Sequence, residues 1–203
     1  MLTPASRSGF PALALVCGLL PIQATQARDK PQDQTISTSV TGPVYANGGA
    51  ITVDSSGTIS GGSTGISGYK TEITTLTNSG TIRGSQSGVG NGRGMIGTLT
   101  NSGLIHSEGH GINDHAGTIV TLINTGTISG LSYGIDNGHG AIGVLTNNGL
   151  IHSDRHGINN RSGTISTLTN HGRISGLSHG INNDFGVIST LTNSGRISGE
   201  SHA

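Results

Sequence analysis

A 23-residue repeat is the feature that most constrains what this chain can fold into. It begins near residue 50 and continues to the end of the 203-residue chain without insertion or deletion. One column of the repeat has Ser55 in its first unit and asparagine in the next six: Asn78, Asn101, Asn124, Asn147, Asn170 and Asn193. Glycine follows two residues later in every unit. A repeat of this length and fidelity predicts a solenoid in which each unit forms one coil.

Apolar residues fill four further columns of the repeat. The column that follows each glycine is Ile59, Ile82, Ile105, Ile128, Ile151, Ile174 and Ile197. Two others are Ile66, Val89, Ile112, Ile135, Ile158 and Ile181, and Ile73, Ile96, Ile119, Ile142, Ile165 and Ile188. The fourth holds Val53, Leu76, Leu99, Leu122, Leu145, Leu168 and Leu191. Short Thr/Ser/Ile segments between glycine-rich turns carry these columns, which is typical of strands and disfavours helices.

We therefore predict an all-β fold, a single-stranded parallel β-helix of about six coils over residues 50–203. Strands of successive coils would pair about 4.8 Å apart, and the apolar columns would become inward ladders. The asparagine column is expected to stack at a turn, with each amide bonded to the next coil and to backbone. With 36 glycines and only five aromatic residues, the composition suits a narrow core. A disordered chain has no reason to keep apolar residues in phase.

The first 27 residues differ in character from the repeat. Arg7 precedes an apolar run over residues 10–22, and Thr25 and Ala27 are the small side chains that a signal peptidase reads. We interpret residues 1–27 as a secretory signal peptide and residues 28–49 as an N-terminal cap or lead-in. A retained membrane anchor is the alternative, but the run is shorter than the roughly 20 residues that span a bilayer as a helix. The exported chain is thus expected to have no transmembrane segment.

Charge and composition exclude several functions. Ten basic and ten acidic residues are spread along the chain, so no basic stripe exists for a nucleic-acid partner. The only cysteine, Cys17, lies in the signal segment, which leaves the exported chain without a disulfide. The carboxylates are scattered, and the constant coil length leaves no inserted loops to build a cleft. We predict a non-enzymatic protein without a cofactor.

Histidine recurs at one turn position, in His110, His156, His179 and His202, and Tyr133 takes that position in the coil between. Imidazoles on neighbouring coils would share a metal ion or titrate as a stack, with His156, His179 and His202 as candidate ligands. The simpler interpretation is solvated turn residues copied by duplication of a two-coil block, and we predict no dedicated metal site.

Threonine also recurs in the strands. Thr-Leu-Thr segments, as at residues 98–100 and 167–169, would point paired threonines outward. This pattern resembles the flat faces of ice-binding solenoids, although Ile123 and Val144 interrupt it. Threonine is also a favourable strand residue in any sheet.

The segments at residues 98–105 and 163–170 resemble the strand repeats in passenger domains of bacterial autotransporters, in the broad pertactin-like group. The similarity covers roughly residues 50–203 together with the signal. It implies a right-handed β-helix at the surface of a Gram-negative cell, or released from it, that acts in adhesion or self-association. Its partners would be host or bacterial surface molecules, or other copies of the chain. Such proteins end in a membrane barrel, which this sequence does not contain, so we expect a truncated passenger. If the truncation is real, the protein would be periplasmic; otherwise it would be at the cell surface, associated with the outer membrane or extracellular.

Two further expectations concern partners and function. The chain stops partway through a coil, so strands around residues 188–197 are expected to have unpaired backbone groups and to associate end to end. The alternative function is a secreted ice- or glycan-binding solenoid that uses the threonine-rich face.

Overall fold

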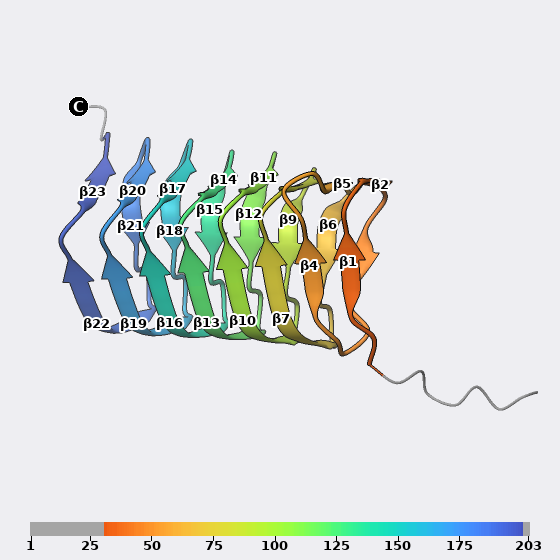
Figure 1. The fold of residues 1–203 in the computed structure, drawn as a ribbon. Helices are drawn as coiled ribbons and strands as arrows, with labels where there is room; N and C mark the ends of the chain where they lie inside the picture. The colour runs from red at the N-terminus through yellow and green to blue at the C-terminus, as the bar shows by residue number, and fades with distance from the viewer. Residues whose placement is uncertain (1–30, 201–203) are drawn as a thin grey trace, which may run out of the picture.

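The computed structural model describes residues 31–200 as a stack of coils built from three parallel sheets (Figure 1). Each complete coil contributes one strand to every sheet, so strands that are consecutive within a sheet come from consecutive coils. The predicted all-β solenoid is confirmed, with about seven coils rather than six. The proposed signal peptide, residues 1–27, lies outside the described residues. The described part of the chain has no helix that could cross a membrane.

Sheet A has the longest strands and pairs in uninterrupted register along most of the stack. It consists of β1 (Gln34–Ile36), β4 (Ile51–Val53), β7 (Glu72–Asn78), β10 (Met95–Asn101), β13 (Thr118–Asn124), β16 (Ala141–Asn147), β19 (Thr164–Asn170) and β22 (Val187–Asn193). From β7 onward each residue lies opposite its equivalent in the next coil, as Leu99 lies opposite Leu76 and Leu122. Residues that share a column of the sequence repeat therefore lie next to one another in consecutive coils of the structure.

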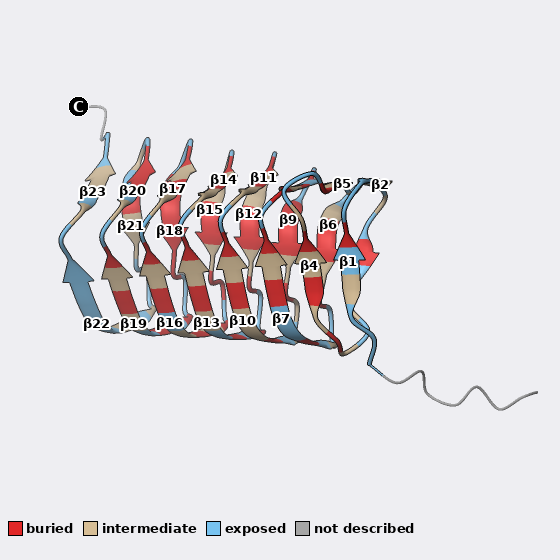
Figure 2. Cartoon of the chain, in the orientation of Figure 1, coloured by how far each residue is buried: buried red, intermediate tan, exposed pale blue. Residues whose placement is uncertain are grey.

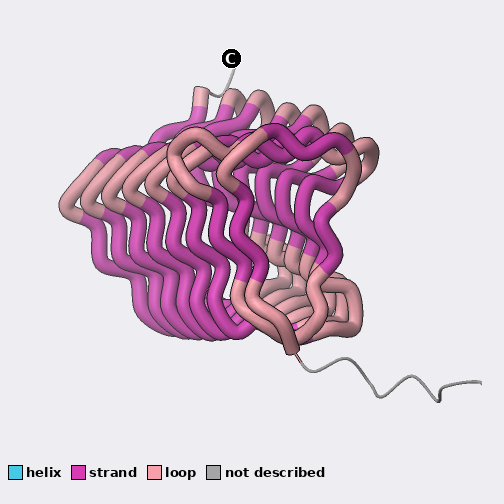
Figure 3. The backbone as a smooth tube through the Cα atoms, turned by 45° about the vertical axis from the view of Figure 1, so that its right-hand side comes forward, coloured by secondary structure: helices cyan, strands magenta, loops and turns pink. Residues whose placement is uncertain are grey.

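Sheets B and C complete each coil. Sheet B consists of β2 (Ser39–Thr41), β5 (Thr58–Ser60), β8 (Thr81–Gly84), β11 (Leu104–Ser107), β14 (Thr127–Gly130), β17 (Leu150–Ser153), β20 (Arg173–Gly176) and β23 (Arg196–Gly199). Sheet C consists of β3 (Val44–Tyr45), β6 (Thr64–Ser67), β9 (Ser87–Gly90), β12 (His110–Asn113), β15 (Tyr133–Asp136), β18 (His156–Asn159) and β21 (His179–Asn182). The corners superpose from coil to coil, as the backbone trace shows (Figure 3).

The first coil extends the solenoid N-terminal to residue 50. Gln34 pairs with Ile51, Ser39 with Thr58 and Val44 with Ile66. All three offsets are shorter than the 23-residue period, so these strands carry no signature of the repeat. That irregular spacing is why the sequence predicts one coil too few.

In the second coil, the structure shows that one predicted column is wrong. Ile51, not Val53, lies opposite Leu76, and Val53 lies opposite Asn78 in the place expected for Ser55. The turn from β4 to β5 has four residues, whereas the turn from β7 to β8 has two. The longer turn shifts β4 by two residues relative to the repeat.

The core is a narrow column of aliphatic side chains. Ile82, Ile105, Ile128, Ile151 and Ile174 are all fully buried in one ladder, whereas Ile197, in the last described coil, is only partly buried. Burial repeats as bands across the strands and is lost in β22 (Figure 2). Each coil thus depends on the next one to cover its core side chains.

Glycine is required where one coil turns tightly over another. A Cβ atom at Gly126 would overlap the carbonyl oxygen of Gly103 in the preceding coil and the backbone of Ser102. Neither backbone can move without breaking the pairing of sheets A and B. By contrast, a Cβ atom at Gly62 would meet no atom within 4 Å.

These two glycines make a matched test of the stacking. We expect Gly126→Ala to lower the free energy of unfolding by about 1–3 kcal/mol, because the added methyl group forces the coils apart. Gly62→Ala should change it by less than about 0.5 kcal/mol. Thermal unfolding followed by circular dichroism measures both, and similar melting temperatures for the two variants would contradict the close approach.

Candidate functional site

The predicted asparagines form a continuous ladder along the corner between sheets A and B. The Nδ2 of each residue donates to the Oδ1 of its equivalent in the next coil at 2.7–2.8 Å, from Asn78 through to Asn193. Asn124 also donates to the carbonyl oxygens of Leu150 and Gly126, each at 3.2 Å. Apart from Asn193, the members are fully buried. The ladder therefore satisfies backbone carbonyls at the corner as well as its own amides.

The ladder has two different ends. Asn78, its first member, has a buried Oδ1 atom without a hydrogen-bond partner, because Val53 stands opposite it in the preceding coil. Asn193, its last described member, has an exposed amide that donates only to Gly195 within its own coil. One end thus has a spare acceptor and the other a spare donor.

A second ladder at the corner between sheets C and A, buried except at Asn183, was missed by sequence reasoning. Its members share the same 23-residue spacing: Asn91, Asp114, Asn137, Asn160 and Asn183. Asn91 donates to Asp114, and Asn137 to Asn160 and Asn160 to Asn183, at 2.6–2.7 Å. The spacing alone would have revealed this ladder, but Asp114 interrupts the run of asparagines.

Asp114 is also where the second ladder breaks. Its Oδ2 atom and the Oδ1 atom of Asn137 in the next coil are both buried without partners. An ionised carboxylate has no proton to donate, so it cannot replace an amide at this step. Burial raises the pKa of Asp114 to about 7, against the opposing hydrogen bond from Asn91. The protonated acid has the O–H group that the step to Asn137 lacks.

The histidine column lies on the outer face of sheet C. His110, Tyr133 and His156 stack with ring centroids 5.0 and 5.5 Å apart and nearly parallel planes. His179 continues the column, with its ring centroid 5.0 Å from that of His156. Burial lowers the pKa of His110, which Asp136 opposes. Burial also lowers the pKa of His156, aided by the positive charge of Arg155 and by His179.

Only part of the candidate metal set can be placed. His156 and His179 are neighbours, with their Nδ1 atoms 3.3 Å apart, whereas His202 lies outside the described residues. Within residues 31–200 no three His, Cys, Asp or Glu side chains gather closely enough to hold a metal ion together.

The threonines of sheet A stand in register on its outer face. Thr98 lies opposite Thr75 and Thr121, and Thr100 lies opposite Thr77 and Ile123. Val144 continues the first of these columns and is exposed. The face is therefore a regular array of threonines with two aliphatic replacements.

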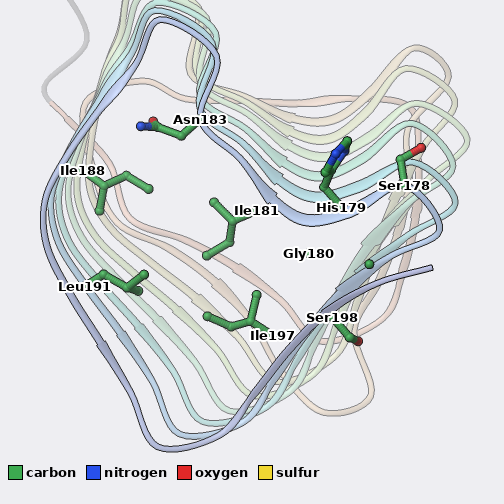
Figure 4. A pocket seen from close by; sticks show the side chains of 10 residues that line it. Ser178, His179, Gly180, Ile181, Asn183, Ile188, Leu191, Ile197 and Ser198 are labelled. Atoms are coloured by element: carbon green, nitrogen blue, oxygen red, sulfur yellow. The ribbon is translucent and has the colours of Figure 1, made fainter. Parts of the chain in front are cut away.

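The end of the stack at β21, β22 and β23 contains a hollow of about 750 Å³ (Figure 4). Ile181, Ile188, Leu191 and Ile197 point into it, and their equivalents in the preceding coil are fully buried. The hollow is the cross-section of the core, and Ser178, His179, Asn183 and Ser198 also line it.

No family model matches the chain, and no curated protein or solved structure is significantly similar to it. The coordinates therefore establish a β-solenoid fold, and none of the comparisons assigns the chain to a family.

The first ladder can be tested at its centre. Asn124→Ala removes the acceptor of Asn101 and the donor to Asn147, so we expect a loss of about 2–5 kcal/mol in the free energy of unfolding. Asn148→Ala, at the exposed next position, should cost less than about 0.5 kcal/mol. Urea unfolding followed by circular dichroism checks both; equal midpoints would show that the ladder adds no stability.

Asp114 predicts a distinctive dependence of stability on pH. Its pKa is higher in the folded state than in the unfolded chain, so its favourable contribution is complete below about pH 4 and is lost as the pH rises to about 7. The shift corresponds to about 4 kcal/mol. Asp114→Asn restores an amide donor and should become increasingly more stable than the wild type between pH 4 and 7, with a constant difference above pH 7.

The exposed neighbours Arg93, His115 and His139 are present in both proteins, so the comparison isolates the change at position 114. Unfolding midpoints measured at several pH values give the difference directly. A difference that does not change between pH 4 and 7 would show that Asp114 keeps an ordinary pKa.

Proposed function

We propose that the chain is an exported, non-enzymatic solenoid of the passenger type that acts in adhesion or self-association at a Gram-negative cell surface. The observation that carries the proposal is the constant coil length. From β5 to β23 equivalent residues are always 23 apart, so no described coil between them has an inserted loop. The buried asparagine amides donate hydrogen bonds from one coil to the next. The surfaces left for binding a partner are the outer faces of the three sheets and the ends of the stack.

Self-association is supported by the match between the two ends of the described stack. Val40 and Val44 of the first coil belong to the same columns as Ile59 and Ile66, respectively. Those columns end at Ile197 and Ile181, beside the hollow. The first coil of a second copy would therefore continue all three parallel sheets and cover the hollow with aliphatic side chains.

The threonine-rich face of sheet A supports a second candidate, ice or glycan binding by a secreted solenoid. The two outward threonine columns are in register from β7 to β22, which gives a regular array of hydroxyl and methyl groups interrupted at Ile123 and Val144. Thermal hysteresis that is present in the wild type and lost in Thr167→Lys would favour this function over adhesion.

Export and adhesion are tested together by expressing the full chain in a Gram-negative host. We expect a mature protein that begins at Arg28, and binding of protein-coated beads to cells or to one another. Beads that neither clump nor bind cells would count against the proposal.

End-to-end association has its own test by analytical ultracentrifugation. We expect the mature chain to associate in a concentration-dependent way, and Ile197→Lys to suppress this because a charge enters the hollow. Thr190→Lys, which adds the same charge on the outer face of the same coil, should not. A monomer at all concentrations up to about 100 μM would contradict stacking.

A further inference from the structure

The histidine column changes geometry at its last described step. The rings of His110, Tyr133 and His156 are stacked with interplanar angles of 9° and 8°. The rings of His156 and His179 are tilted by 46°. Their centroids are 5.0 Å apart, yet their Nδ1 atoms are only 3.3 Å apart. The two rings therefore lean together at their Nδ1 edges, unlike the parallel pairs above them.

The distance between these nitrogens fits a shared metal ion. Imidazole nitrogens bind Zn²⁺ at about 2.0–2.1 Å, and two such ligands of a tetrahedral ion lie about 3.3–3.4 Å apart. The geometry points to a two-imidazole site for a divalent transition metal ion between His156 and His179 on sheet C, with water completing the coordination. The ion would link the strands β18 and β21 of consecutive coils.

The surroundings supply the chemical conditions for such a site. His156 is only 7% exposed, and a neutral imidazole has one ring nitrogen with a free lone pair that can bind a metal ion. His179 is exposed and points away from the hollow at the end of the stack, so an ion can reach the pair from solvent (Figure 4). The nearby cation Arg155 opposes a metal ion, although its guanidinium donates to the hydroxyl of Tyr133 at 3.0 Å.

A direct Nδ1–H···Nδ1 hydrogen bond is the competing explanation for the short distance. It needs one proton between the two nitrogens, whereas a metal ion needs both nitrogens free of protons. Metal binding distinguishes the two arrangements and does not depend on the proposed function of the chain.

The chain offers matched variants for the test. Position 156 is equivalent to Tyr133 and position 179 to Ser87, so His156→Tyr and His179→Ser introduce residues that the column already holds. His115 and His139 form a control pair on the corner between sheets C and A, exposed and edge to face at 5.3 Å. No hydrogen bond joins these two rings, so His115→Ser removes an imidazole without touching the site.

The experiment is isothermal titration of the untagged mature chain with CuCl₂, NiCl₂ and ZnCl₂, with MgCl₂ as a control. We expect one ion per chain, tightest for Cu²⁺ and absent for Mg²⁺, with weaker binding at acid pH because protons compete with the metal ion for the imidazole nitrogens. His156→Tyr and His179→Ser should each weaken binding by at least roughly tenfold, and His115→Ser should leave it unchanged.

Thermal unfolding gives an independent readout, because an ion bound to the folded chain raises its melting temperature. If His156→Tyr fails to fold, the exposed His179→Ser decides the result. No binding to the wild type, or equal binding to His179→Ser and the wild type, would overturn the site.

Discussion

Parallel backbone pairing between consecutive coils is the interaction on which the rest of the structure depends. It holds equivalent residues one strand spacing apart, so any side chain that repeats in sequence meets its own copy in space. Aliphatic residues then make an inward column, asparagines a hydrogen-bonded ladder and imidazoles a stack. Each coil is covered by its neighbours, and stability is expected to be the sum of similar local contributions rather than the property of one large core.

The two buried asparagine ladders explain how a narrow core tolerates polar corners. A turn exposes carbonyl groups that no strand can satisfy, and the amides of Asn101 and Asn124 donate to them while also bonding to each other. Buried polar groups are stabilising only when they are satisfied. Asp114 shows the converse, because one changed atom leaves two buried oxygens without partners.

The sequence predicts the fold well where the period is constant, because phase alone identifies the inward isoleucines and the first ladder. It fails where phase is lost. The strands of the first coil pair at offsets shorter than 23 residues. In the second coil, the four-residue turn after Val53 shifts β4 by two residues relative to the repeat. The second ladder was hidden by Asp114, although its spacing is regular. The column of His156 and His179 could be predicted, but their tilt depends on side-chain torsions that repeat spacing does not encode.

The unequal ends of the first ladder give the molecule a direction. Every amide from Asn78 to Asn170 donates toward the C-terminal coil, so the dipoles add head to tail as they do in a helix. A residue added after Asn193 would meet a spare donor. The spare acceptor of Asn78 is buried, because Val53 and then Ile36 continue the same column toward the N-terminus. Two copies placed tail to tail would bring donor against donor. The ladder thus gives the rod a polarity, with a hydrogen-bond donor at the C-terminal end of the column and an aliphatic side chain, Ile36, at its N-terminal end.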